Sequence, residues 1–333
     1  MITRDLRQHP LQLGVACSFQ IQKKMLKYNL EQISGRMACG EGLHWDSGKK
    51  CMYFCDINNS MIFRYVPKTN ALFQAKVEAP FVSLIIPIKG ASNKFIVGIG
   101  HSTAIMKWDG VSETVKKSDL EVLHTVEEDK VRNRFNDGKC DPAGRVFLGT
   151  MGGLVNGIWE DKQGKFYSFG SDRKLIQHFG DVGISNGLCW SLDGKILYYV
   201  DSLRFSIDAL DYNVQTGQTA NRRVVFDLPK NGVEGTPDGM TIDADGNLWL
   251  ALYGGYGLIC VNPKTQKLVT KIPIPGKFIT CVQFGGDNLD EMYVTSATIE
   301  TDPQELNVSP YLGGTFKITG LGVKGCDSIP AVL

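Results

Sequence analysis

A recurring unit of strands and turns constrains the fold of this 333-residue chain more than any other feature. Each unit reads as a turn, a strand, a second turn, a second strand and, in the clearest copies, a closing turn that starts with Asp or Asn. Successive units are roughly 45–52 residues apart, which is the spacing of blades in a β-propeller. The six copies begin at Asp46, Asn93, Asp141, Ser191, Asp243 and Asn288.

The segments between the turns are rich in Val, Ile, Tyr, Phe and Trp, and no long helical period interrupts them. We therefore expect an all-β chain that folds as a six-bladed β-propeller. A two-sheet sandwich is the structural alternative, but it does not account for the regular spacing. The propeller should comprise residues 34–333, and residues 1–33 should form an N-terminal extension.

The charge balance excludes several classes of partner. The chain has 36 basic and 35 acidic residues and a formal net charge of +1, so no strong field would attract nucleic acid or a membrane surface. A small, weakly charged ligand is expected instead. The nine cysteines are scattered singly, which indicates reduced thiols. We expect a cytoplasmic protein, with the nucleus as an additional location.

Four of the units carry an oxygen-bearing side chain five residues before the turn, and in three of them a glycine follows directly. These residues are Glu41, Asn136, Asn186 and Asp238. If the following segment is the innermost strand of each blade, the four side chains converge at one mouth of the central channel. Inward-facing carboxylates would repel one another without a cation, so the pattern indicates a central metal site.

The alternative is that these residues only cap turns, as Asp, Asn and Gly often do. If they do bind a metal, oxygen ligands favour one divalent ion such as Ca²⁺ or Mg²⁺. The absence of His and Cys at the four positions argues against a structural zinc site, although Zn²⁺ or Mn²⁺ could occupy an open one.

Several motifs resemble the regucalcin, senescence-marker and gluconolactonase family, and together they span about residues 36–325. The stretches Phe81–Ser112 and Tyr293–Ala297 are most similar to its insect branch, which includes luciferin-regenerating enzymes. The motifs are Arg134–Arg145 (RFNDGKCDPAGR), Gly149–Met151 (GTM), Ile184–Leu188 (ISNGL), Tyr198–Ser202 (YYVDS), Pro237–Met240 (PDGM) and Ile318–Gly325 (ITGLGVKG).

The resemblance implies a six-bladed propeller with one divalent metal, Ca²⁺ first, held by Glu41, Asn186 and Asp238. It assigns Arg134 and Asn136 to the substrate and makes Asp238 the general base as well as a ligand. The implied reaction is the opening of a small sugar lactone or related ester: the metal polarises the carbonyl and Asp238 activates water.

One departure from the family pattern weakens the expectation of a sugar substrate. After Gly-Thr-Met, vertebrate relatives carry a pair of glutamates, whereas this chain has Gly152, Gly153 and Leu154. The lid should therefore be less polar. Two other functions stay open: a luciferin-regenerating-type hydrolase of a more apolar molecule, and a non-catalytic calcium-binding regulatory protein.

Overall fold

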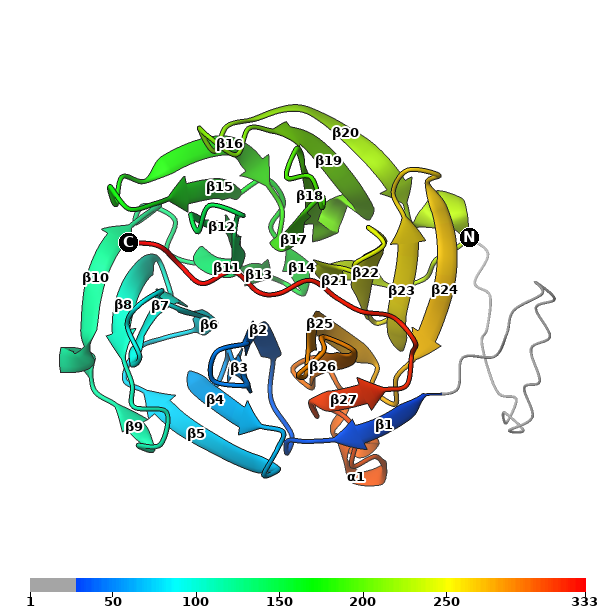
Figure 1. Cartoon of the computed structure of the whole chain (residues 1–333), viewed down its shortest axis with the longest axis horizontal. Helices are drawn as coiled ribbons and strands as arrows, with labels where there is room; N and C mark the ends of the chain where they lie inside the picture. The colour runs from blue at the N-terminus through cyan, green and yellow to red at the C-terminus, as the bar shows by residue number, and fades with distance from the viewer. Residues whose placement is uncertain (1–27) are drawn as a thin grey trace, which may run out of the picture.

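The computed structural model describes residues 28–333, which form 27 strands and one short α-helix, α1 (Pro303–Val308). The strands assemble into sheets arranged around a common axis (Figure 1). The chain is thus all-β with a propeller-like fold, as the repeat predicts. No helix among the described residues is long and apolar enough to cross a membrane.

Each main sheet is an antiparallel meander whose first strand lies nearest the axis (Figure 1). One sheet holds β2 (Gly40–Asp46), β3 (Cys51–Asp56), β4 (Met61–Val66) and β5 (Ala71–Val77), with β9 (Thr114–Val115) parallel to β5. The next holds β6 (Val82–Pro87), β7 (Lys94–Ile99), β8 (Ser102–Lys107) and β10 (Leu120–Thr125). A third sheet holds β11 (Arg134–Cys140), β12 (Val146–Met151), β15 (Gly164–Phe169) and β16 (Ile176–Val182). A fourth holds β17 (Ser185–Trp190), β18 (Ile196–Asp201), β19 (Ser206–Tyr212) and β20 (Thr219–Asp227).

The remaining main strands form one eight-stranded sheet with two halves. The halves are joined where Tyr253 pairs with Phe278. One half holds β21 (Thr236–Ile242), β22 (Leu248–Tyr253), β23 (Gly257–Asn262) and β24 (Lys267–Pro273). The other holds β25 (Phe278–Gly285), β26 (Glu291–Ala297), β27 (Phe316–Thr319) and β1 (Asn29–Gln32).

The apolar core lies between neighbouring sheets rather than on the axis. Within residues 28–333, six clusters of buried hydrophobic side chains each combine residues of two adjacent sheets or sheet halves. In one of them Trp45 of β2 stacks on Tyr293 of β26, with ring centres 6.0 Å apart. Because burial of apolar surface holds the sheets to one another, the axis is left free for polar side chains.

Both ends of the described chain contribute to closing the ring. β1 is the outer strand beside β27, in the sheet half that follows β24. The sheet therefore includes residues that the sequence analysis assigned to the extension, whereas residues 1–27 lie outside the described part. At the other end, residues 320–333 cross the face of the ring near the axis (Figure 1). Ala331 exchanges backbone hydrogen bonds with Pro87 and Lys89, and Val332 N donates to Gly144 O.

Candidate metal centre and active site

The innermost strands are irregular where the predicted site residues lie. In the pairs β11–β12, β17–β18 and β21–β22 the register shifts by one residue, so two residues of the inner strand oppose one of its partner. Such bulges re-aim side chains that would otherwise alternate between the two faces of a sheet. The displaced pairs are Asn136 with Asp137, Asn186 with Gly187, and Asp238 with Gly239. A corresponding shift follows Glu41 in β2–β3.

The glycine after each predicted ligand lets the next inner strand approach closely. A Cβ atom on Gly187 would lie 2.5 Å from Asp238 O and Met240 N, and one on Gly239 would lie 2.8 Å from Cys281 Cα. Gly42 has φ +64° and its Cβ position is 3.0 Å from Leu84 Cα. The glycine therefore permits tight packing around the axis, which is separate from the role expected for the polar residue before it.

Two buried aspartates fix the approach to the ligand positions. Asp56, at the end of β3, accepts hydrogen bonds from Ala38 N and Cys39 N, just before Glu41. Asp201, at the end of β18, accepts the same pair of bonds from Gly183 N and Ile184 N, just before Asn186. The repeated aspartate at the end of the second strand is thus structural, because it accepts hydrogen bonds from the backbone segment that leads into the first strand.

The carboxyl groups of the centre are buried and repel one another. Glu41 is 5% exposed and Asp238 is 7% exposed. Burial, and then the neighbouring Asp137, raise the pKa of Glu41 to about 8. Burial, and then Glu41 and Asp137, raise the pKa of Asp238 well above its usual range. These interactions couple the acids on β2, β11 and β21 in one electrostatic cluster, to which β11 contributes Asp137.

Asn186 supplies the clearest sign that a ligand belongs in this cluster. It is 4% exposed, and its Nδ2 donates to Ser202 Oγ at 3.0 Å, while its Oδ1 has no hydrogen-bond partner. The side chain also lies beside Asp238, where it lowers the pKa of that carboxyl against the stronger effect of burial. A buried amide oxygen without a donor is costly, and a cation would satisfy it.

Arg134 and Asn136 lie beside the acids. Arg134 Nη1 donates to Asn136 Oδ1 at 2.6 Å, and Asn136 Nδ2 donates to Ser185 O at 2.9 Å. Burial lowers the pKa of Arg134, and interactions with acidic groups that include Glu41 and Asp238 oppose that shift. The guanidinium group is therefore held next to the carboxyl cluster, and its contact with a substrate stays a prediction.

The donor set fits a hard divalent cation, provided that the amide takes part. Residues 28–333 contain no group of three or more His, Cys, Asp or Glu side chains placed to hold one metal ion. Glu41 and Asp238 therefore need the free Oδ1 of Asn186 as the third protein donor. Three oxygen donors with open positions suit Ca²⁺ or Mg²⁺, which complete their coordination with water or substrate.

A second polar layer, which the sequence did not predict, lies beside the acids. Lys139 Nζ donates to Met240 O at 2.9 Å and to Gln283 Oε1 at 3.2 Å, and its charge lowers the pKa of Asp137 against the larger opposing effect of burial. Burial and Lys139 also lower the pKa of His44 to about 3. The signal was present in β11, where Asp137 and Lys139 are charged residues in an inner strand.

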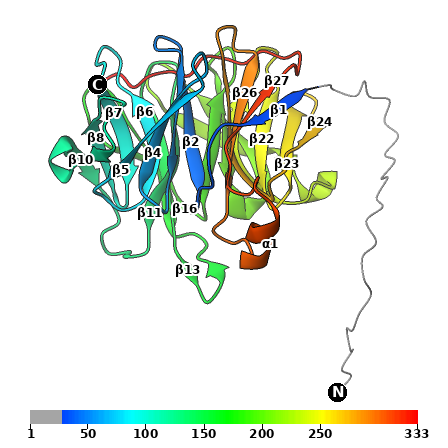
Figure 2. The same cartoon turned by 90° about the horizontal axis from the view of Figure 1, so that it is seen from below.

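The short hairpin of β13 (Leu154–Val155) and β14 (Ile158–Trp159) projects from one face of the ring, opposite residues 320–333 (Figure 2). Figure 1 shows the same hairpin near the axis. It follows Met151, which pairs with Arg134, so it lies at the mouth of the candidate centre. Leu154 is 49% exposed and Ile158 is 74% exposed. The apolar character that the sequence predicts for the lid is therefore present at its surface.

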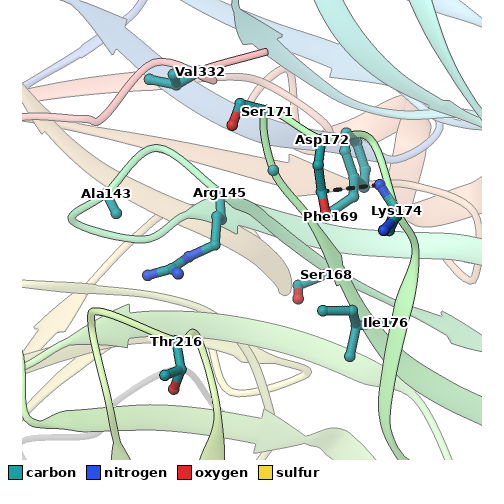
Figure 3. Close-up of a pocket in the computed structure, with 11 residues that line it drawn as sticks. Ala143, Arg145, Ser168, Phe169, Ser171, Asp172, Lys174, Ile176, Thr216 and Val332 are labelled. Atoms are coloured by element: carbon teal, nitrogen blue, oxygen red, sulfur yellow. Dashed lines mark hydrogen bonds between the residues drawn. The ribbon is translucent and has the colours of Figure 1, made fainter.

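A cavity of about 320 Å³ lies elsewhere, beside Val332 of the C-terminal segment (Figure 3). Its main charged group is already paired. Arg145 Nε and Nη2 each donate to the Asp141 carboxylate at 2.8 Å, Nη1 donates to Gln215 O at 3.1 Å, and Nη2 also donates to Val214 O. The guanidinium group has little capacity for a ligand, and we assign it to turn structure.

Comparison with known proteins gives one consistent result. Residues 39–298 match the family model described as the SMP-30/gluconolactonase/LRE-like region. Regucalcin of Homo sapiens is 43% identical over 288 residues, which cover 86% of this chain and 92% of that protein. Regucalcin of Gallus gallus is 40% identical over 298 residues, covering 89% and 96%.

Two solved structures extend the comparison to the fold. A luciferin-regenerating enzyme is 37% identical, covers 92% of this chain and all of its own, and superposes with a TM-score of 0.86. A calcium-binding protein, regucalcin, from Agrobacterium tumefaciens is 24% identical, with 91% and 97% coverage and a TM-score of 0.80; at that identity it supports the fold alone. The chain is a member of the SMP-30/gluconolactonase/LRE-like family.

Proposed function

We propose that this protein is a metal-dependent hydrolase that opens a small lactone or related ester. The observation that carries the proposal is the unpartnered, buried Oδ1 of Asn186 beside two carboxyl groups that repel one another. Family membership supports the same class of chemistry. If each half of the eight-stranded sheet counts as one blade, the proposed propeller has six blades around this centre.

Glu41, Asn186 and Asp238 would hold the ion, with Ca²⁺ as the first choice and Zn²⁺, Mn²⁺ or Mg²⁺ as alternatives. When bound, the cation would polarise the ester carbonyl and offset the negative charge that develops on its oxygen.

The chain's own residues would supply the remaining chemistry. Asp238 accepts a proton from the attacking water. Arg134 and Asn136 are linked by a hydrogen bond of 2.6 Å, and together they orient the substrate ring over the centre. Since Glu41 and Asp238 are almost fully buried, bulk water is kept from the reacting groups.

The decisive experiment combines metal removal with a matched pair of variants. Chelation should abolish hydrolysis of a lactone panel, and adding back one of the four divalent ions should restore it. Asp238→Asn should lower kcat by about 10²–10⁴-fold, the usual range for loss of a general base. Asp245→Asn, on an exposed turn, should keep the wild-type rate.

Two outcomes would contradict the proposal. An Asp238→Asn variant with the wild-type rate would exclude this acid as the base. A protein that binds Ca²⁺ tightly but hydrolyses no lactone or ester with any of the four ions would instead be a regulatory calcium-binding protein.

A related hydrolase of a more apolar substrate is the second candidate. The exposed side chains of Leu154 and Ile158 at the mouth favour it, as does the likeness to a luciferin-regenerating enzyme. The lactone panel should therefore contain apolar members beside sugar lactones.

The cytoplasmic location stays a prediction.

A further inference from the structure

Phe81 is an exposed aromatic residue beside the candidate active site. It precedes β6, in which all six residues are buried, yet Phe81 itself is 42% exposed. The centre of its ring lies 5.9 Å from Cζ of Arg134. The ring thus shares one surface with the guanidinium group that we assign to the substrate.

The backbone of Phe81 is in an unfavourable conformation. Its φ is +50°, in the left-handed region that bulky L-residues rarely adopt and that glycine adopts without steric cost. Backbone hydrogen bonds connect the segment that holds Phe81 to β11. Gly100 N donates to Phe81 O, and Gly100 O accepts from Phe135 N, next to Arg134. Phe81 thus combines two unfavourable features, a strained backbone and an apolar ring exposed to water. Strain of this kind is often found at functional sites.

The other side chains at this mouth would not suit a polyhydroxylated ligand. The β13–β14 hairpin presents Leu154, Val155 and Ile158 to solvent. Arg132 at its base is already paired, since Nε and Nη2 donate to the Glu160 carboxylate at 2.8 and 2.7 Å. Sugar hydroxyls placed against these residues would lose water without gaining hydrogen bonds, whereas a planar apolar ring would not.

We propose that Phe81 determines substrate specificity by stacking on the aromatic part of an aryl-fused lactone whose carbonyl lies at the candidate metal centre. The inference rests on the proposed lactonase function and narrows its substrate class. The guanidinium group of Arg134 lies over one face of the phenyl ring, so the exposed part of the ring adjoins the group that we assign to the substrate. A glucono-lactone ring would gain little from contact with the phenyl ring.

The test compares Phe81→Ala with Phe205→Ala. Phe205 is the matched control, because it is also a phenylalanine, is 40% exposed, has φ +53°, and lies in the turn between β18 and β19, which belong to a different sheet. The substrates are dihydrocoumarin, an aryl-fused lactone, and D-glucono-δ-lactone. Binding of 3,4-dihydro-2(1H)-quinolinone, the lactam analogue that resists hydrolysis, is measured by calorimetry.

Phe81→Ala should weaken lactam binding about tenfold and lower kcat/KM for dihydrocoumarin by a similar factor through KM, as expected for loss of one aromatic stack. Turnover of glucono-δ-lactone should stay within about twofold, and Phe205→Ala should change neither substrate. Phe81→Tyr should restore binding. Phe81→Gly relieves the backbone strain, so it should be as weak in binding as Phe81→Ala without loss of thermal stability.

Unchanged lactam affinity in Phe81→Ala would overturn the proposal, and so would an equal loss for both lactones. The result stays separate from the proposed function. If wild-type protein hydrolyses neither lactone with any metal, the lactonase proposal fails. The lactam titration then still decides whether Phe81 binds aromatic ligands.

Discussion

The amide of Asn186 has a fixed orientation because its nitrogen is committed elsewhere. Its Nδ2 donates to Ser202 Oγ, which in turn donates to Pro237 O at 2.7 Å, at the entry of β21. The chain of bonds turns Oδ1 away from Ser202 and leaves it free. Ser202 is therefore a positioning residue that holds the amide oxygen ready for a cation.

Substitutions along this chain of hydrogen bonds should weaken metal binding to different extents. Asn186→Ala removes a proposed ligand and should weaken Ca²⁺ binding by about 100-fold or more, whereas Ser202→Ala should weaken it by about tenfold because it loosens only the orientation. Calorimetric titration of metal-stripped protein measures both. Asn231→Ala, an exposed site on another segment, is the control. Equal affinities for Asn186→Ala and wild type would exclude the amide as a ligand.

The raised pKa of Glu41 predicts a pH dependence with a definite sign. Its folded-state pKa is about 8, above the ordinary value of 4.5, so the metal-free folded state holds the proton more tightly than the unfolded chain. The resulting stability is fully present below pH 4.5 and is lost as pH rises through about 8. Metal-free protein should therefore show a falling Tm over this interval, and Glu41→Gln should flatten the profile.

Metal binding should show the complementary trend. A cation must displace the Glu41 proton, so Ca²⁺ affinity should rise with pH and level off above about 8. Saturating Ca²⁺ should also remove the fall in Tm. A calcium affinity that does not change between pH 5 and about 8 would contradict the assignment of Glu41 as a ligand.

At the scale of elements, the inner strands combine bulges with glycines, and the packing role of the glycines can be tested. Gly187→Ala would place a methyl group 2.5 Å from two backbone atoms of β21, which cannot yield as a flexible side chain would. We expect a loss of roughly 1–3 kcal/mol in the free energy of unfolding, as for other overpacked sites. Urea denaturation measures it.

Gly35→Ala is the control, because nothing lies within 4 Å of its Cβ position, and it should change stability by less than about 0.5 kcal/mol. If Gly187→Ala were equally harmless, the packing between β17 and β21 would be looser than the structure shows. The glycine in each Asn-Gly or Asp-Gly step would then have no packing role.

The repeat predicted the elements well because one register is copied around the ring. Counting back from each turn identified Glu41, Asn136, Asn186 and Asp238, and the structure gathers their strands around the axis. The roles of Glu41, Asn186 and Asp238 as ligands, and of Asn136 as a substrate contact, remain predictions. The charge of Lys139 in an inner strand was visible in the sequence, but its contacts with Met240 and Gln283 come from other sheets and could not be predicted from the register.

Phe81 shows a different limit of the sequence. Nothing in its neighbours marks it as exposed, because all six residues of the strand that follows are buried. Its orientation depends on a positive φ and on Gly100, which belongs to the next turn of the same sheet. Backbone conformation at a single non-glycine residue is set by tertiary contacts and cannot be inferred from local sequence patterns.

At the scale of the whole molecule, the C-terminal segment ties the inner-strand turns together. Ser328 Oγ accepts from Trp45 N at 3.3 Å and from Gln283 Nε2 at 2.8 Å, and Gly325 N donates to Leu289 O at 2.8 Å. Figure 2 shows this segment on the face opposite the β13–β14 hairpin. It therefore links several sheets without touching the mouth of the candidate centre.

Removal of residues 326–333 should lower thermal stability more than it lowers activity. The truncated chain loses the hydrogen bonds of Ser328, Ala331 and Val332, each worth about 1 kcal/mol, so Tm should fall by several degrees. Differential scanning calorimetry with parallel lactone assays checks this expectation. Ser328→Ala should give a smaller shift. A truncated protein that is as stable as wild type but inactive would show that the segment serves catalysis instead.

The pairing of β1 with β27 also bears on how the protein is made. Ser34 Oγ accepts a hydrogen bond from Thr315 N, 281 residues further along the chain. During translation, the first strand must therefore wait for almost the entire polypeptide to leave the ribosome before it finds its neighbour. Until then the nascent chain carries an unpaired strand edge. If synthesis stalls or ends at a premature stop codon, this edge stays unpaired and favours aggregation or degradation.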